Sequence, residues 1–268
     1  MKIISNKKDL DNLIGQQKNL GFVPTMGAIH NAHIYLVKKS KSMCKKTIVS
    51  IFINKPQFNR KSDYKNYPRN LNKDIRILRK HKVDYLYLPK HKEIYISKAK
   101  KINTGKLGKI LCGKFRPGHF EAVVDVIDRF INLIKPSMIF LGKKDMQQLK
   151  IIDYFVKKNY RNIKIIPCKT IREKNGIAYS SRNFLLSLKE KSIASKIYRI
   201  IKTSKKRLIN KQITVKEIKR KIYSLGVYNI DYISILNINK ITQPYIKGKK
   251  FRIFISYYLR KIRLIDNI

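Results

Sequence analysis

The sequence predicts an α/β fold, in which a Rossmann-like parallel sheet with helices on both faces is followed by a smaller α+β domain. Two observations lead to this prediction. Over the first two thirds of the chain, short apolar runs alternate with stretches of helical periodicity, as expected of strands and helices that follow one another in a parallel sheet. After about residue 170 the order changes to two helical stretches and then two strand-like stretches.

The expected strands of the first domain are runs rich in β-branched and aromatic residues, at 20–25, 47–53, 83–89, 138–142 and 163–167. Helices are expected between them, at about 30–44, 70–81, 118–134 and 145–158. The third of these helices has the clearest pattern, because apolar residues recur at helical spacing from Phe120 to Ile134. Ligands of such sheets bind at the carboxyl ends of the strands, so we expect the functional residues there.

The second domain is expected to hold two helices, at 187–210 and 214–226, and two strands, at 228–238 and 249–259. No long linker rich in proline, glycine or serine separates the halves, and the join falls near the segment KTIREKNG. We therefore divide the chain into a nucleotide- and substrate-binding domain at 1–171 and a smaller domain at 172–268 that covers the active site.

The chain has 268 residues, a formal net charge of +46 and 43% hydrophobic residues. The apolar content is ordinary for a folded protein, whereas the charge would attract nucleic acid, anionic membranes or phosphate-bearing substrates. The lysines are spread along nearly the whole chain, together with abundant isoleucine and asparagine, and form no basic tail. Two interpretations stay open: a genome-wide preference for A- and T-rich codons, or selection for binding.

The three cysteines, Cys44, Cys112 and Cys168, show neither a CxxC motif nor a Cys/His spacing typical of a zinc site. A reducing compartment is the simplest explanation. The N-terminal segment lacks the apolar core of a signal peptide, and no run approaches the ~20 apolar residues that span a bilayer. We therefore expect a cytoplasmic protein that makes no membrane contact.

The segment VPTMGAIHNAH, at 23–33, places His30 and His33 after a tight turn and at the start of an expected helix. Residues three apart lie on the same helix face, so both imidazoles can point at one ligand. Free backbone N–H groups and the helix dipole favour an anion at a helix N-terminus. The combination predicts a phosphate site with two additional donors, although an unrelated pair of histidines at this spacing is the alternative.

Other polar segments follow expected strands or lie between the expected strands and helices. In FLGKKDMQQL, at 140–149, Gly142 is expected to let the backbone turn, Lys144 to meet a phosphate, and Asp145 to cap the next helix through its side chain. In IAYSSRN, at 177–183, two hydroxyls and Arg182 can donate hydrogen bonds to a triphosphate. The alternative is that both segments are ordinary connections, and the same holds for RPGHF at 116–120. The polar segment 54–70 is longer than a minimal loop and is a candidate functional loop.

These segments, in this order, closely resemble the pantoate–β-alanine ligase family. The resemblance includes VPTMGAIHNAH, VSIFINKPQF, YPRN, LCGKFRPGHF, FLGKKDMQQL, YSSRNFLLS and the closing RLIDNI, so it spans nearly the whole chain. Several collinear motifs are far more specific than any one of them. The resemblance implies a ligase of the HxGH nucleotidyltransferases, which condenses pantoate with β-alanine to pantothenate, AMP and pyrophosphate, using ATP and Mg²⁺, through an enzyme-bound pantoyl adenylate.

The resemblance also implies roles for single residues. His30, His33 and Lys144 match phosphate-binding catalytic residues, and Gln57 and Gln148 match glutamines that bind pantoate. The implied ATP contacts are Thr25, Met26, His33, Gly142, Lys144, Asp145, Ile171, Tyr179, Ser180, Ser181 and Arg182. Asp74 aligns near a position associated with magnesium. A homodimer is implied as well.

The chain departs from the family pattern in a few places. Ala32 replaces the glycine of the HxGH signature, which adds a methyl group where adenine approaches the backbone. Tyr179 stands where the family has methionine, Pro56 comes one place late, and Arg260-Lys261 replaces a Gly-Thr pair. None of these changes removes a charged or hydrogen-bonding catalytic group. Two alternatives remain: a related adenylyltransferase for another small acid, and a basic nucleic-acid-binding protein. We expect no specific nucleic-acid partner, because charge alone leaves the polar residues at successive strand ends unexplained.

Overall fold

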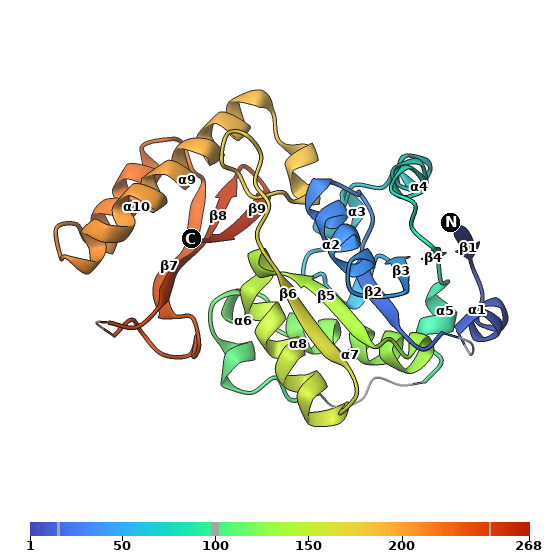
Figure 1. Ribbon diagram of the computed structural model, residues 1–268. Helices are drawn as coiled ribbons and strands as arrows, with labels where there is room; N and C mark the ends of the chain where they lie inside the picture. Colours follow the sequence, from blue (N-terminus) through green and yellow to red (C-terminus); the bar gives the residue numbers. More distant parts are fainter. Residues whose placement is uncertain (15–16, 98–101, 247) are drawn as a thin grey trace.

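The structure, a computed structural model, describes residues 1–14, 17–97, 102–246 and 248–268 (Figure 1). Its larger lobe contains a parallel six-stranded sheet in the order β1-β4-β3-β2-β5-β6. The strands are β1 (Lys2–Ile4), β2 (Leu20–Thr25), β3 (Lys46–Ile51), β4 (Tyr85–Tyr87), β5 (Met138–Gly142) and β6 (Lys164–Cys168). The strand order changes direction between β2 and β5, and the carboxyl edge of the sheet at such a point is where ligands bind.

Alternate residues of the central strands pack on opposite faces of this sheet. Phe22 of β2 pairs with Ile48 of β3, and both lie in one apolar cluster, whereas their neighbours Val23 and Val49 pair in the other. All four residues have no accessible surface. Full burial of a side chain of this size stabilises the fold by about 1.5–3 kcal/mol relative to exposure, so both faces must be covered.

Helices cover each face. On the side of Phe22 lie α1 (Lys7–Ile14), α7 (His119–Ile134) and α8 (Met146–Asn159), and Phe130 of α7 packs its ring 5.4 Å from that of Phe22. On the side of Val23 lie α2 (Asn31–Lys41) and α4 (Leu71–Lys80), which contribute Val37 and Leu78. The predicted parallel sheet with helices on both faces is therefore confirmed.

Short elements occupy the connections on the carboxyl side of the strands. They are η1 (Lys55–Gln57), α3 (Lys61–Lys65), α5 (His91–Ile94), η2 (Lys106–Lys109), α6 (Cys112–Phe115), η3 (Lys143–Asp145) and η4 (Ser181–Leu185). The long polar segment 54–70 thus contains η1 and α3. Its length allows it to fold over the end of the sheet.

The second lobe packs two helices against an antiparallel sheet. The helices are α9 (Leu188–Ile209) and α10 (Val215–Tyr223), and the strands, in the order β7-β8-β9, are β7 (Asn229–Asn237), β8 (Phe251–Leu259) and β9 (Ile262–Asn267). Figure 1 shows α9 and α10 lying together along this sheet. Capping boxes begin both helices, because the hydroxyls of Ser187 and Thr214 accept the N–H groups of Glu190 and Glu217. The predicted smaller α+β domain is confirmed, while the boundary at 171/172 stays a prediction.

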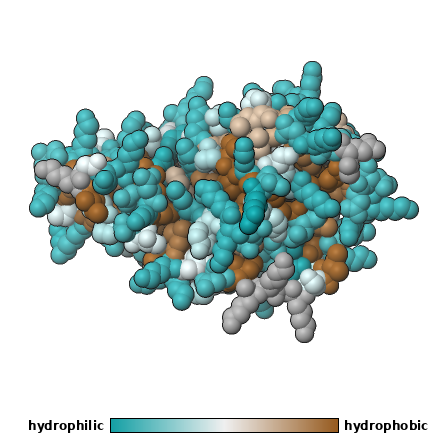
Figure 2. Space-filling model, turned by 60° about the horizontal axis from the view of Figure 1, so that its bottom comes forward, coloured by the Kyte–Doolittle hydropathy of each residue, from teal (hydrophilic) through white to brown (hydrophobic). Residues whose placement is uncertain are grey.

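The prediction from the sequence did not include β1, α1 and β9, and several predicted ends differ from the observed ends by a few residues. The strand expected at 83–89 is reduced to Tyr85–Tyr87, and the helix expected at 30–44 ends at Lys41. In the described part of the chain, no helix is both long and apolar enough to cross a membrane. Figure 2 shows hydrophilic side chains over most of the face in view, in keeping with lysines spread along the chain.

Candidate active site

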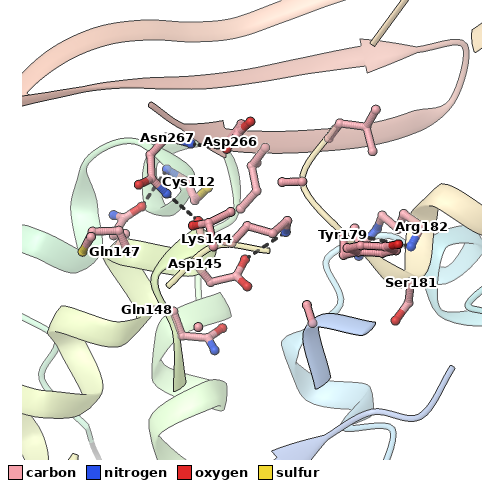
Figure 3. Close-up of a pocket in the computed structure, with 18 of the residues that line it drawn as sticks. Cys112, Lys144, Asp145, Gln147, Gln148, Tyr179, Ser181, Arg182, Asp266 and Asn267 are labelled. Carbon is pink, nitrogen blue, oxygen red and sulfur yellow. Dashed lines mark hydrogen bonds and ion pairs between the residues drawn. The ribbon is translucent and has the colours of Figure 1, made fainter. Parts of the chain in front are cut away.

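A cavity of about 320 Å³ lies between the carboxyl edge of the parallel sheet and the second lobe. Figure 3 shows Lys144, Asp145 and Gln148 on one side of it and Tyr179, Ser181 and Arg182 on the other. The cavity is lined by every site residue that the sequence predicts except Asp74, namely Thr25, Met26, His30, His33, Gln57, Gly142, Lys144, Asp145, Gln148, Ile171, Tyr179, Ser180, Ser181 and Arg182. Folding therefore brings together motifs that are far apart in the sequence.

The turn after β2 is held by a buried carboxylate. Gly27 and Ala28 have φ angles of 79° and 51°, in the left-handed region that disfavours a residue with a Cβ atom. The two oxygens of Asp74 accept the N–H groups of Ala28, at 2.8 Å, and Ile29, at 2.7 Å. The Asp74 side chain does not line the cavity. It stabilises the strained turn from which α2 begins.

The two histidines stack at the start of α2. The ring centroids of His30 and His33 are 3.9 Å apart, with an angle of 12° between the planes. Nδ1 of His33 accepts the N–H of His30 at 3.4 Å, so its ring proton belongs on Nε2, which leaves an N–H donor for a ligand. Among the described residues, the buried Nδ1 of His30 has no hydrogen-bond partner.

Both imidazoles are neutral near pH 7. Burial and the neighbouring Lys144 ammonium lower the pKa of His30 to about 4. Burial, the His30 ring and Lys144 lower the pKa of His33 as well. The permanent positive charge at this end of the cavity therefore comes from Lys144, and the histidines can act as uncharged N–H donors.

The turn between β5 and α8 presents Lys144 to the histidines. Its ammonium lies 3.3 Å from Oδ1 of Asp145. Asp145 occupies the N-cap position of α8, but its side chain makes no capping hydrogen bond, so the predicted capping role is wrong. Gly142 has an ordinary φ of −78°, so the predicted need for a flexible turn is also wrong. A Cβ atom at Gly142 would meet no described neighbour within 4 Å, which leaves open space beside the strand end.

The segment 179–182 closes the cavity from the opposite side. Tyr179 accepts the side-chain amide of Asn31 at 3.0 Å, and its ring lies 5.8 Å from that of His30. Ser181 donates to the carbonyls of Gly27 and Ala28, at 3.4 and 3.3 Å, and so joins this segment to the turn after β2.

Arg182 belongs to the same segment. Its guanidinium makes a forked ion pair with Asp63 of α3, at 2.7 and 3.2 Å. The Oγ of Ser180 accepts the N–H of Arg182 at 3.3 Å. A part of the long segment 54–70 therefore orients one of the predicted phosphate ligands.

The predicted glutamines Gln57 and Gln148 both line the cavity. Nε2 of Gln57 lies 2.9 Å from the sulfur of Met26, and its Oε1 accepts from Asn54 at 3.1 Å. Gln148 and its neighbour Gln147 both line the cavity, but Gln147 is buried and donates its side-chain amide to the carbonyls of Leu107 and Ile110, each at 2.7 Å. Of the two adjacent glutamines, Gln148 is thus free to contact a ligand.

Two cavity residues, Arg116 and His119, were missed as site residues, although the sequence had drawn attention to RPGHF. Arg116 donates to the carbonyl of Gln57 at 3.0 Å and lies 3.1 Å from His119 Nε2. No carboxylate of the described residues forms an ion pair with Arg116. Burial, together with the neighbouring Arg182 and Arg263, lowers the pKa of Arg116 to about 10. A half-buried cation without a carboxylate partner beside a cavity is suited to bind an anion.

The structure also bears on the expectations for metal binding, for the cysteines and for the departures from the HxGH pattern. Among the described residues, no group of three His, Cys, Asp or Glu side chains could hold a metal ion. Cys44, Cys112 and Cys168 are buried free thiols. Ala32 lines the cavity beside the histidines, and Arg260 forms an ion pair with Glu190 at 2.5 and 2.7 Å, away from the cavity.

Known proteins resemble this chain over its full length. A family model described as pantoate-beta-alanine ligase matches residues 2–268. A pantothenate synthetase of Francisella tularensis subsp. novicida is 41% identical over 273 residues, covering 100% of this chain and 97% of the relative.

Solved structures agree with this match. A crystal structure of pantoate-beta-alanine ligase from Francisella tularensis, complexed with beta-gamma ATP and beta-alanine, superposes with a TM-score of 0.88 at 38% identity, covering 100% of this chain and 97% of that one. Pantothenate synthetase from Thermus thermophilus gives a TM-score of 0.89 at 29% identity, with coverage of 100% and 99%. With this sequence, fold and cavity, the chain belongs to the pantoate–β-alanine ligase family.

Proposed function

We propose that this protein condenses pantoate with β-alanine in an ATP-dependent reaction that passes through an enzyme-bound pantoyl adenylate. The observation that supports this proposal most directly is a cavity with two kinds of lining. Its lining includes groups that can donate to phosphates (His30, His33, Lys144 and Arg182) and the glutamines Gln57 and Gln148. The cavity thus offers groups suited to a triphosphate together with groups suited to a small polar acid.

In the first step a pantoate carboxylate oxygen attacks the α-phosphorus of ATP. The bond to the β-phosphate oxygen breaks, and pyrophosphate leaves with the electron pair. Negative charge grows on the phosphates during this step, so donors fixed around them stabilise the transition state more than the substrate. The neutral N–H groups of the histidines, the ammonium of Lys144 and the guanidinium of Arg182 can supply such donors.

In the second step the amine of β-alanine attacks the activated carbonyl carbon. The new C–N bond replaces the acyl–phosphate bond, AMP leaves, and the amine loses a proton. No side chain is covalently modified, because positioning of the acid and the amine is sufficient. We assign Arg116 to the carboxylate of a substrate, because the guanidinium lines the cavity without a carboxylate partner among the described residues.

Magnesium, when bound with ATP, would neutralise phosphate charge and orient the triphosphate. Mg²⁺ is commonly held by substrate phosphates, water and one or two carboxylates, so it does not require an acidic cluster of the protein. Asp74, which the resemblance associates with magnesium, does not line the cavity, whereas Asp145 does. A cytoplasmic location and a homodimer complete the proposal, and both are supported by membership of the family.

The proposed reaction is tested by following the two half-reactions separately. Purified protein with ATP, magnesium and pantoate should exchange labelled pyrophosphate into ATP without β-alanine, because adenylate formation is reversible. Addition of β-alanine should convert the adenylate to pantothenate and AMP. Exchange that requires β-alanine would contradict the adenylate intermediate, and AMP formation independent of pantoate would contradict the assigned substrate.

A further inference from the structure

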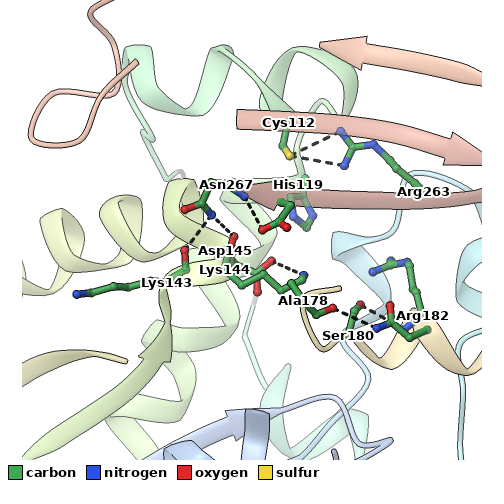
Figure 4. A network of polar contacts seen from close by, with 12 residues as sticks. Cys112, His119, Lys143, Lys144, Asp145, Ala178, Ser180, Arg182, Arg263 and Asn267 are labelled. Carbon is green, nitrogen blue, oxygen red and sulfur yellow. Dashed lines mark hydrogen bonds and ion pairs between the residues drawn. The ribbon is translucent and has the colours of Figure 1, made fainter. Parts of the chain in front are cut away.

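Asn267, at the end of β9, bridges the second lobe to the turn that carries Lys144. Its side-chain Nδ2 donates to the carbonyls of Lys143, at 3.0 Å, and Lys144, at 2.6 Å. The residue is 1% exposed, so water does not compete for these carbonyls from its side. Figure 4 shows the Asn267 amide lying against the Lys143–Lys144 turn.

The orientation of this amide is fixed by an arginine. Oδ1 of Asn267 accepts from Nη1 of Arg252 at 2.6 Å. A guanidinium can only donate, so the amide oxygen must face Arg252 and the amide nitrogen must face the two carbonyls. Flipping the amide would place its NH₂ group against the guanidinium and its oxygen against two carbonyl oxygens.

The backbone of Asn267 is anchored too. Its N–H donates to Oδ1 of Asp266 at 2.8 Å, and Asp266 forms a forked ion pair with Arg172, at 2.6 and 3.0 Å. Arg172 lies in the connection that follows β6. The residue that holds the Lys144 turn is therefore itself anchored to the connection between the two lobes.

We propose that Asn267 is a positioning residue for Lys144, which couples docking of the second lobe to charge stabilisation in adenylate formation. The two hydrogen bonds determine where the backbone of the turn lies, and the backbone determines where the ammonium of Lys144 lies relative to the histidines. A displacement of about 1 Å at a reacting group can lower a rate about 10²-fold. This inference rests on the proposed function, because it assigns Lys144 to the phosphates of ATP.

The test compares Asn267→Ala and Asn267→Asp with Asn237→Ala. Asn237 is a matched control, because it is also a buried asparagine of the second lobe and, among the described residues, its side chain accepts N–H groups only within its own turn, from Asn239 and Lys240. Pantoate-dependent exchange of pyrophosphate into ATP is measured for each variant together with its melting temperature. Asn267→Ala should lower the maximal exchange rate about 10- to 100-fold and leave the KM for pantoate within about twofold.

Asn267→Asp should lower the rate further, because a carboxylate oxygen would then face two carbonyl oxygens. Asn237→Ala should lower the melting temperature and leave the exchange rate unchanged. If Asn267→Ala loses stability but keeps the normal rate well below its melting temperature, Asn267 is merely structural and the proposal is overturned. Should Asn267→Ala fail to fold, Asn267→Ser, which keeps one donor, is measured in its place under the same criteria.

A double-mutant cycle with Lys144→Ala tests whether the effect passes through Lys144. In the Lys144→Ala background, Asn267→Ala should change the exchange rate by less than about twofold, because the group that it positions is absent. Full additivity of the two losses would overturn the proposal. Failure of the proposed function can be distinguished from failure of the proposal for Asn267. If the wild-type protein shows no pantoate-dependent exchange, the function itself is contradicted before any variant is compared.

Discussion

Asp74 and Ala28 are 46 residues apart in the chain, yet the carboxylate of Asp74 accepts the backbone N–H of Ala28 at 2.8 Å. Ala28 is held at a φ of 51°, a conformation that a non-glycine residue adopts only when its surroundings impose it. A side chain of α4 thereby determines the path of the turn that delivers His30 to the cavity. Asp74 does not line the cavity, but through this hydrogen bond it holds the turn that positions a residue of the cavity.

Asp74→Asn should lower stability and adenylate formation together. The amide can accept one of the two N–H groups but would turn its own NH₂ toward the other, and a buried donor without a partner costs about 1–3 kcal/mol. Chemical denaturation and pyrophosphate exchange measure the two effects. Raising the magnesium concentration should not restore exchange. Recovery at high magnesium would instead make Asp74 a metal ligand.

His33→Ala and Lys144→Ala should each lower adenylate formation about 10²–10³-fold, as expected for loss of one donor to a developing charge. Binding of pantoate should change little, because Gln57 and Gln148 remain. Supplied pantoyl adenylate and β-alanine should still give pantothenate at a nearly normal rate in both variants. Each variant is measured for its melting temperature and for the two half-reactions. Unaltered adenylation in His33→Ala would remove this histidine from the mechanism.

Arg116→Met should raise the KM for pantoate or for β-alanine about 10- to 100-fold, because a charge-assisted hydrogen bond contributes about 1.5–3 kcal/mol. The KM for ATP should change less. Steady-state kinetics with each substrate varied in turn identify which carboxylate Arg116 binds. Arg220→Met, on the exposed face of α10, removes one positive charge far from the cavity and is the matched control. Equal effects of the two variants would show that only net charge matters.

Stability should fall as the pH drops from about 6.5 toward 4. Burial lowers the pKa of His30 to about 4 and, with the help of Arg116, that of His119 to about 3, while an unfolded histidine titrates near 6.5. In this window the unfolded chain binds more protons than the folded one, so the free energy of unfolding decreases by up to ~1.4 kcal/mol per pH unit for each histidine. Above pH 7 these groups should have no effect.

Urea unfolding at pH 7.5, 6.5 and 5.5 measures this slope, above the range in which most carboxylates titrate. His119→Gln removes one of the titrating groups and should make the slope shallower. A free energy of unfolding that stays constant between pH 6.5 and 5.5 would show that the histidines are not held neutral.

Any binding of nucleic acid should be non-specific and should collapse with salt. Screening over a Debye length of about 8 Å at physiological ionic strength weakens a diffuse field of lysines. Fluorescence anisotropy of labelled duplexes of two unrelated sequences, measured over a series of increasing salt concentrations, gives the salt dependence. Sequence-selective binding that persists at high salt would favour the nucleic-acid interpretation of the +46 charge.

The sequence carried enough information for the sheet, because buried strands and amphipathic helices leave periodic patterns. It failed where an element is short or partly charged. β1 has three residues, and β9, with the sequence IRLIDN, mixes charged and apolar residues on a strand that lies against the first lobe. Such elements are determined by their neighbours rather than by their own composition.

The site, like the fold, could be predicted only in part from the sequence. The motifs gave the residues that line the cavity, but the partners that orient them come from elsewhere in the chain. Asp63, which pairs with Arg182, lies in the five-residue helix α3, which was not predicted from the sequence. Arg116 stands in a segment that is equally compatible with a plain helix start. Only the three-dimensional arrangement shows that its half-buried guanidinium lines the cavity without a carboxylate partner among the described residues.

Because the cavity has walls from both lobes, a bound nucleotide would contact both at once and act as a bridge between them. A ligand that binds only the folded state adds RT ln(1 + [L]/Kd) to its stability, about 2.7 kcal/mol at a concentration of about 100 Kd. Here that free energy would oppose separation of the lobes as well as unfolding of each. Binding of the nucleotide and association of the two lobes are therefore thermodynamically coupled in this protein. Depletion of nucleotide would weaken the association of the lobes as well as stop the reaction.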